Sequence, residues 1–252
     1  FRSWTNTTKR FFYLYLYLKK SKSLKAIHLE GDCILIATKN VLDKLKSPRK
    51  AIYYPRQSAS VGCAEIFLVN GLEPLEKLLK YINSNWSKPE KTDMTILGEF
   101  LNKSEQAQKL ISNPEEDLSS EFIYDAGLIA RYFLGSEARN HRLAFSRRGI
   151  LNLSEAAFKP SFYKILRGNS NKLILKNIIT NKTLILGTLH LHNKKVPKNI
   201  DKLFKSAIRE SAKKRGFFWK LGKFDYIVLL ERLLSKMSVI FKGYQNKEVR
   251  FR

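Results

Sequence analysis

The sequence has few cysteines, no long apolar run and no glycine-rich nucleotide motif, and each absence excludes a class of protein. Its 252 residues include two cysteines, Cys33 and Cys63, which are too few and too widely spaced for a disulfide framework or a cysteine metal cluster. Both lie in apolar surroundings, which favours buried, reduced thiols. Because no stretch of eighteen apolar residues occurs, we expect no membrane span and no membrane partner. Because there is no phosphate loop and no dinucleotide-binding glycine pattern, we expect no cofactor.

Acidic residues are also scarce. Lys and Arg number 47 whereas Asp and Glu number 22, which gives a net charge of +25. Such an excess of positive charge repels itself unless a polyanion neutralises it. A nucleic acid fits this role better than a membrane surface, because no stretch of the sequence predicts an amphipathic helix with one continuous cationic face.

The positive charge is distributed unevenly. Residues 121–252 hold 28 Lys or Arg and 9 Asp or Glu, whereas residues 1–120 hold 19 and 13. This change in composition predicts two domains with a boundary near residue 120. Hydrophobic residues make up 44% of the chain, which is enough to bury a sizeable core.

Residues 1–120 alternate predicted strands and helices, which is typical of a small α/β domain with two or three layers. The alternating aromatic and aliphatic residues from 10 to 18 predict a strand. Asn40 is expected to cap a short helix at residues 40–46, and the prolines and basic residues of segment 47–60 predict a loop. The other predictions are strands at residues 33–38, 64–69 and 94–97, and helices at residues 72–83, 104–110 and from Pro114 onward.

Residues 121–252 predict a basic α+β extension. Segments 172–179 and 182–192 are expected to form a β-hairpin around Thr180 and Asn181. Helices are predicted at residues 122–133, 200–215 and 224–241.

His190 and His192 are the strongest candidates for catalysis. On a strand both imidazoles would point to one face, where a metal could bind, and Tyr226 at a helix start could serve as a nucleophile. This pattern is typical of a metal-dependent single-strand nuclease. No third ligand is evident, so a structural or RNA-facing pair is favoured, and we expect neither enzyme activity nor a metal site. The acidic run at residues 115–117 fits the first turn of a helix, where it complements the helix dipole.

Basic clusters in the second part indicate phosphate contacts instead. Phe217, Phe218 and Trp219 follow one of these clusters, and flat rings beside basic side chains suit folded RNA with unstacked bases. The candidate RNA-binding residues of this part are Arg147, Arg148, Lys194, Lys195, Lys213, Lys214 and Arg215.

The order of elements in residues 10–120 resembles a known family. A hydrophobic strand runs into a Lys-Asn-x-Leu helix start in ILIATKNVL. A Gly-led strand (GCAEIFLV), a helix, a strand ending near Gly (MTILGEFL) and a Leu-x-x-x-Pro segment that opens the next helix (LISNPEEDL) follow in turn. This order is similar to that of the large-subunit ribosomal stalk-base protein, which is number ten in the nomenclature of that subunit.

The resemblance implies a domain that binds ribosomal RNA at the stalk base, with Lys39 and Asn40 at or near the RNA. It also implies a C-terminal helix that anchors acidic stalk dimers, for which residues 224–241 are the candidate. The residues after 120 have no counterpart in that family and look like the extensions of mitochondrial ribosomal proteins. Charge adds further candidate RNA-binding residues in the first part, namely Lys44, Lys46, Arg49, Lys50 and Arg56.

We therefore expect a structural constituent of the large subunit of the mitochondrial ribosome, located in the matrix. Its expected partners are ribosomal RNA and neighbouring ribosomal proteins. A small-subunit ribosomal protein or an assembly factor is the alternative within RNA binding, because residues 32–39 also faintly suggest a small-subunit α/β protein. The single-strand nuclease is the alternative outside it.

Overall fold

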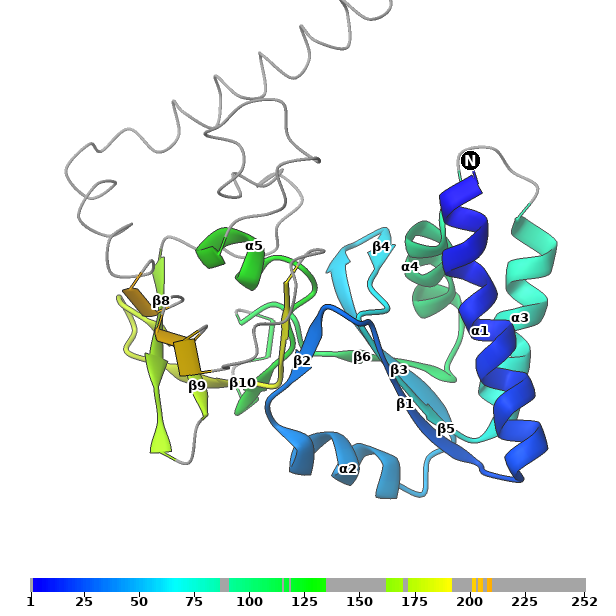
Figure 1. Ribbon diagram of the computed structural model, residues 1–252, viewed down its shortest axis with the longest axis horizontal. Helices are drawn as coiled ribbons and strands as arrows, with labels where there is room; N and C mark the ends of the chain where they lie inside the picture. Colours follow the sequence, from blue (N-terminus) through cyan, green and yellow to red (C-terminus); the bar gives the residue numbers. More distant parts are fainter. Residues whose placement is uncertain are drawn as a thin grey trace, which may run out of the picture.

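The computed structural model describes residues 2–86, residues 91–134 without 115 and 118, residues 162–169 and 172–191, and residues 201, 202, 204, 205, 208 and 209. The chain has an α/β fold, as predicted, and its described residues form a five-stranded sheet, a four-stranded sheet and a two-stranded ribbon (Figure 1). No helix in this part of the chain is long and apolar enough to cross a membrane.

The first sheet is organised around a fully buried strand, β5, with the neighbouring order β1-β5-β3-β4. Strands β1 and β3 both run antiparallel to β5, and β6 pairs in parallel with β3. The strands are β1 (Lys25–Leu29), β3 (Ala51–Ser58), β4 (Val61–Gly62), β5 (Ile66–Asn70) and β6 (Ala107–Leu110).

Helices cover both faces of this sheet, which gives three layers (Figure 1). Successive side chains of a strand point to opposite faces. Phe67 and Val69 of β5 therefore pack against α1 (Arg2–Ser21), α3 (Leu72–Asn85) and α4 (Asp93–Lys103). Ile66 and Leu68 pack on the other face against α2 (Thr38–Lys46).

The second sheet has the order β7-β10-β9-β8 and a core of its own. The predicted β-hairpin is confirmed as β9 and β10, with Asn181 at a φ of 59° in the connection. The described residues between 201 and 209 are helical. The elements are β7 (Phe122–Ile123), α5 (Ile129–Leu134), β8 (Tyr163–Arg167), β9 (Leu173–Asn177) and β10 (Thr183–Leu186).

A two-stranded antiparallel ribbon joins the two sheets. Strand β2 (Cys33–Leu35) comes from the first part of the chain, and β11 (Thr188–His190) follows the second sheet. Ile34 of β2 packs in the core of the second sheet, so the first 120 residues supply part of the second core.

The predicted strand at residues 10–18 is wrong, because this segment lies inside helix α1. Its apolar residues satisfy a helical period as well as an alternating one: Phe11 and Leu18, seven residues apart, are both buried against the first sheet. The intervening Tyr13 and Tyr17 are 65% and 66% exposed. A run of large apolar residues at every position fits both periods, so spacing could not decide between them.

Three further predictions in the first part are wrong. Residues 94–97 lie in α4 and not in a strand, because Thr92 and Thr95 form a capping box that starts the helix. Residues 104–110 contain β6 and not a helix, and the predicted loop at 47–60 contains β3. Both strands gain backbone hydrogen bonds from each other, a long-range pairing that local composition does not reveal.

Two helix predictions also need correction. The described residues from 114 to 120 form turns and irregular backbone and no helix. Residues 122–133 divide into β7 and α5, because Phe122 and Ile123 pair with β10 before the chain turns into the helix.

Two glycines allow α4 to touch the end of the first sheet. A Cβ atom on Gly98 would lie 2.2 Å from the carbonyl oxygen of Ser60, and one on Gly62 would lie 2.7 Å from Cβ of Leu97. Helix α4 is therefore in direct contact with the backbone of the β3–β4 turn, and neither glycine position has room for a side chain.

We predict that Gly98→Ala lowers the free energy of unfolding by about 1–3 kcal/mol, the usual cost of overpacking. Gly31→Ala is the matched control: its Cβ would meet nothing within 4 Å, so its effect should stay within about 0.5 kcal/mol. Urea denaturation followed by circular dichroism measures both. Equal stability of the two variants would contradict the close packing of α4 on β4.

Candidate functional site

Basic residues gather at one end of the first sheet. Because β1 and β3 run antiparallel to β5, both begin where β5 ends, and Lys25 and Ala51 lie on either side of Asn70. The Asn70 side chain donates hydrogen bonds to the carbonyl oxygens of Ser47 and Arg49, each at 2.8 Å. These bonds hold the loop between α2 and β3 against the end of the sheet.

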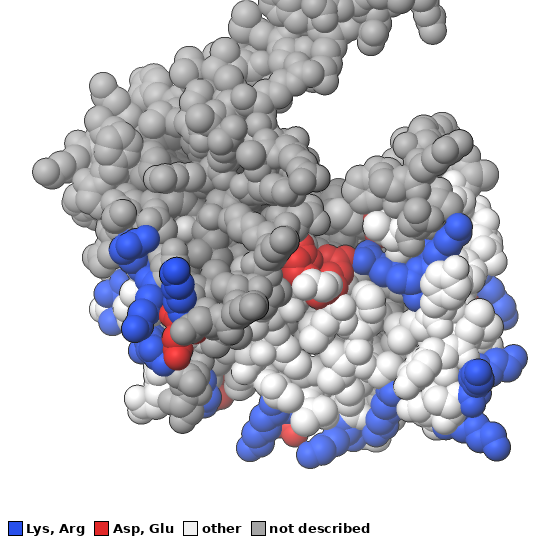
Figure 2. Space-filling model, viewed as in Figure 1, with Lys and Arg blue, Asp and Glu red and all other residues white. Residues whose placement is uncertain are grey.

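We call this group the basic edge: it comprises Lys22, Lys25, Lys46, Arg49 and Lys50, all exposed. Figure 2 shows blue side chains along the rim of the molecule in the region of α2 and the end of α1. The described residues place few counter-charges nearby. Asp43 lies 3.8 Å from Lys46. Hydrogen bonds from Gln106 and Lys77 lower the pKa of Glu73, and the charge of Lys50 lowers it further.

Of the predicted RNA-binding residues, three belong to the basic edge, namely Lys46, Arg49 and Lys50. Lys39 and Lys44 are also exposed, along α2 beside it. The sequence prediction missed Lys22 and Lys25, because only the antiparallel pairing of β1 with β5 brings them to this end of the sheet.

Asn40 and Arg56 are engaged elsewhere. Asn40 does not cap α2, since the N-cap residue is Ala37 and no side chain caps it. The side-chain oxygen Oδ1 of Asn40 instead accepts a hydrogen bond from the hydroxyl of Tyr124. The Arg56 guanidinium donates to the carbonyl oxygens of Ser58 and Ala59 in the β3–β4 turn. Arg56 therefore stabilises a turn at the far end of β3.

The remaining candidates lie outside the described residues. They are Arg147, Arg148, Lys194, Lys195, Lys213, Lys214 and Arg215, together with His192, Tyr226 and the helix expected at residues 224–241.

The outer face of α1 carries exposed rings beside lysines. Tyr13, Leu16 and Tyr17 are 65%, 58% and 66% exposed. Leu16 and Tyr17 lie one helical turn after Tyr13, and exposed Lys20 continues the same face one turn later. The other face of the helix is fixed in place by Arg10, whose guanidinium pairs with Glu30 and, at 2.7 Å, with Asp93.

A second group of polar residues lies at the opposite end of the sheet, where β1 ends and β5 begins. We call Glu30, Asp32, Cys63, Glu65 and His190 the His190 cluster. Figure 2 shows a group of acidic atoms near the middle of this face, with basic atoms directly beside it. Three strand ends position the cluster: Glu30 and Asp32 follow β1, Cys63 and Glu65 precede β5, and His190 ends β11.

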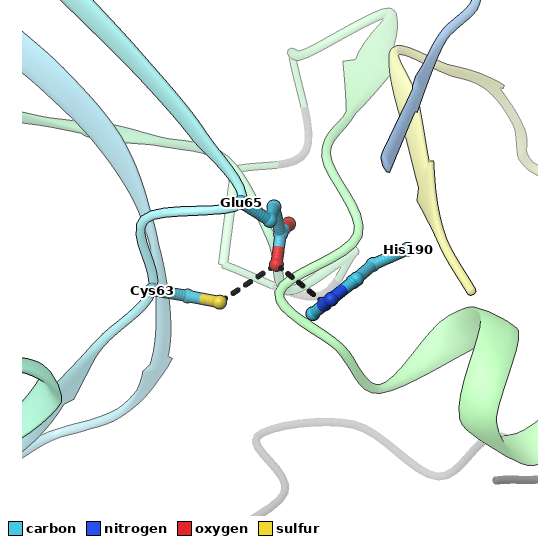
Figure 3. A group of neighbouring side chains, drawn as sticks. All are labelled: Cys63, Glu65 and His190. Carbon is cyan, nitrogen blue, oxygen red and sulfur yellow. Dashed lines mark hydrogen bonds and ion pairs between the residues drawn. The ribbon is translucent and has the colours of Figure 1, made fainter. Parts of the chain in front are cut away.

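The imidazole of His190 lies between carboxylates on two sides. Its Nε2 atom is 3.3 Å from Asp32 Oδ1 and 3.4 Å from Glu30 Oε2, and its Nδ1 atom is 3.4 Å from Glu65 Oε2. The thiol of Cys63 donates to the same oxygen of Glu65 at 2.7 Å (Figure 3). The side chain of Glu65 is fully buried, and that of His190 is 13% exposed.

Burial and the contacts among its members shift the pKa values of the residues in the cluster. Burial acts to lower the pKa of His190, but hydrogen bonds to Asp32, Cys63 and Glu65 outweigh it and raise the pKa above its ordinary value. Burial raises the pKa of Glu65 to about 7, with His190 opposing the shift. Burial and the charge of Glu65 also raise the pKa of the Cys63 thiol, which makes Cys63 a poor nucleophile.

Asp125 fixes the backbone of His190. One of its carboxylate oxygens accepts from the backbone N–H of His190 at 3.0 Å, and its two oxygens together accept from Ile129 and Ala130 at the start of α5. Its own N–H donates to Thr188 Oγ1 at 3.0 Å. A fully buried carboxylate thus ties β11 to α5.

Within the described residues, two sets of side chains have the donor atoms and spacing to hold a metal ion. Cys63, Glu65 and His190 form one set, and Glu30, Asp32 and His190 form the other; in each set the ligand atoms lie within 4.8 Å of one another. The nuclease hypothesis used His190, His192 and Tyr226, and it stays a prediction. The structure places His190 among carboxylates that no short motif in the sequence connects with it.

Comparisons of the chain with protein-family models, curated proteins and solved structures found no match. The function is therefore inferred from the residues of the chain and their arrangement.

We predict that Glu65→Gln changes how stability depends on pH. A carboxyl with an ordinary pKa of 4.5 when unfolded and about 7 when folded favours the folded state fully below pH 4.5, and this contribution is lost as the pH rises to 7. The wild-type protein should therefore lose stability relative to Glu65→Gln over this range, by up to about 3 kcal/mol, since one pKa unit corresponds to about 1.4 kcal/mol.

Urea denaturation at several pH values, with a chelator present, measures the difference between the two proteins. Taking the difference removes the pH dependence of the many surface charges, which both proteins share. A constant difference from pH 4.5 to 7 would show that Glu65 ionises normally in the folded chain.

Proposed function

We propose that this chain is a non-enzymatic RNA-binding structural protein of a ribonucleoprotein particle. The basic edge carries the proposal: five exposed cations gather at one end of a folded sheet, in a chain with a net charge of +25. A folded polyanion would offset this charge, and phosphate contacts of this kind supply most of the affinity of sequence-independent binding.

The exposed face of α1 supports RNA as the polyanion. Tyr13 and Tyr17 present flat rings to solvent, and Lys20 lies on the same face. Unpaired bases stack on such rings while nearby ammonium groups contact phosphates. Double-stranded DNA offers few unstacked bases, so this combination favours folded or single-stranded RNA.

We further propose that the particle is the large subunit of the mitochondrial ribosome, with the chain at the stalk base. This part of the proposal rests on three successive motifs that keep their expected elements: the Lys-Asn-x-Leu helix start after β2, the Gly-led strand β5, and helix α3. The expected strands at residues 10–18 and 94–97 add nothing to it, because both segments lie in helices. It is supported by the exposed position of Lys39, the first residue of the Lys-Asn-x-Leu motif, on α2 beside the basic edge. Asn40 of the same motif would act indirectly, through its hydrogen bond with Tyr124.

We expect the full-length protein to bind folded ribosomal RNA with a strong dependence on salt. Replacing Lys46, Arg49 and Lys50 together by Gln should reduce the slope of log K against log salt by about 2–3, because each lost phosphate contact contributes about 0.7–0.9. Filter binding or fluorescence anisotropy over a range of salt concentrations measures the slope.

The matched control replaces three lysines outside the basic edge, Lys91, Lys109 and Lys172, by Gln. Lys91 and Lys109 already pair with Glu99 and Glu116. This control removes the same net charge and should change the slope by less than the basic-edge variant. Equal slopes for the two triple variants would refute a specific role for the basic edge.

The choice of particle has a separate test. Tagged full-length chain expressed in its own cells should co-sediment with the large ribosomal subunit of mitochondria and withstand a moderate salt wash. Co-sedimentation with the small subunit would support the small-subunit alternative, and sedimentation as free protein would exclude a ribosomal constituent.

A further inference from the structure

Three different donor atoms converge where the first sheet meets the β2–β11 ribbon. The sulfur of Cys63, a carboxylate oxygen of Glu65 and a ring nitrogen of His190 lie within 4.8 Å of one another. Figure 3 shows Glu65 between the other two, with one oxygen directed toward both. Sulfur, imidazole nitrogen and carboxylate oxygen are the ligands that zinc prefers in proteins, whereas calcium and magnesium take oxygen.

The imidazole has the orientation of a metal ligand with a supporting carboxylate. Its Nδ1 atom faces Glu65 and Cys63, while its Nε2 atom faces Asp32 at 3.3 Å and Glu30 at 3.4 Å. A metal-bound histidine almost always donates its second ring N–H to a carboxylate or carbonyl, which fixes the ring and raises its basicity. Asp32 and Glu30 fill that role here.

The burial of Glu65 supplies an independent indication of cation binding. Its side chain is fully buried, and its oxygen Oε2 faces both Cys63 and His190. Burying a carboxylate costs free energy unless a cation or hydrogen bonds compensate its charge. A cation bound at Oε2 would offset this cost.

We propose that Cys63, Glu65 and His190 bind one zinc ion that links the first sheet to the β2–β11 ribbon. The thiolate and the carboxylate together balance the two positive charges of the metal, and the imidazole binds in its neutral form through Nδ1. A water molecule is left for the fourth position of a tetrahedral site.

Binding releases protons to solvent. The Cys63 S–H bond breaks as the sulfur–zinc bond forms, and an imidazolium gives up its Nδ1 proton while Nε2 keeps the proton shared with Asp32. No electron is transferred. Zinc affinity therefore falls as the pH falls, because protons compete for the same donor atoms.

The proposed site is structural and lies at the other end of the first sheet from the basic edge. It does not rest on the proposed function: loss of zinc binding would leave the RNA hypothesis standing, and failure to bind RNA would leave the zinc site standing.

The test uses purified full-length protein, stripped with a chelator and checked for folding by circular dichroism. Titration with Co²⁺ should give one bound ion per chain and a sulfur-to-cobalt charge-transfer band in the near ultraviolet, and Zn²⁺ should displace the cobalt. Cys63→Ser should abolish the charge-transfer band. Asp32→Asn, which removes a carboxylate that faces Nε2 of His190, should weaken binding by about 10- to 100-fold.

Glu73→Gln is the matched control, since Glu73 is an exposed carboxylate that pairs with Lys77 on α3. It should bind Co²⁺ as the wild type does. The wild-type measurement decides the question even if a variant fails to fold: folded wild-type protein that takes up neither Co²⁺ nor Zn²⁺ overturns the proposal. A charge-transfer band that persists in folded Cys63→Ser overturns it as well.

Discussion

The structure depends on one buried strand. All five residues of β5 are buried, and the strand is hydrogen-bonded on both sides, to β1 and to β3. Its alternate side chains fill two cores, one beneath α1, α3 and α4 and the other beneath α2. Both polar groups follow from it, because the basic edge forms where β5 ends and the His190 cluster forms where it begins.

The two sheets are joined by secondary structure and by buried polar contacts at the same place. Strand β2 pairs with β11 and adds Ile34 to the second core. The backbone N–H of Leu191 donates to the carbonyl oxygen of Asp32 at 2.8 Å, and Nδ1 of His190 lies 3.4 Å from the buried carboxylate of Glu65. The parts of the chain before and after residue 120 differ in composition, yet they share the β2–β11 ribbon.

Sequence alone predicted the elements with a clear local signal. The helix predicted at residues 72–83 is confirmed as α3, which buries the stripe Leu75, Leu78, Leu79 and Ile82. The hairpin predicted around Thr180 and Asn181 is confirmed as β9 and β10. Helix α1 was missed because apolar residues at nearly every position fit two periods at once. Strands β3 and β6 were missed because each depends on the other, across more than fifty residues.

The candidate sites show the same division. Charge identified Lys46, Arg49 and Lys50, but only strand pairing adds Lys22 and Lys25. The sequence predicted His190 as a candidate because it forms a short motif with His192. It did not predict Glu65, which lies in an apolar segment 125 residues earlier. A charged residue inside an otherwise buried strand segment was the available signal, since a carboxylate is rarely buried without a partner.

Gathering five cations at one end of β5 makes the first sheet electrically asymmetric, because the carboxylates at the other end are paired with Arg10 and His190. A polyanion still beyond contact distance would attract the basic edge most strongly, so the protein would be turned before it touched its target. Such alignment raises the association rate more than the affinity. The effect weakens as the salt concentration rises, because salt shortens the range of the electric field.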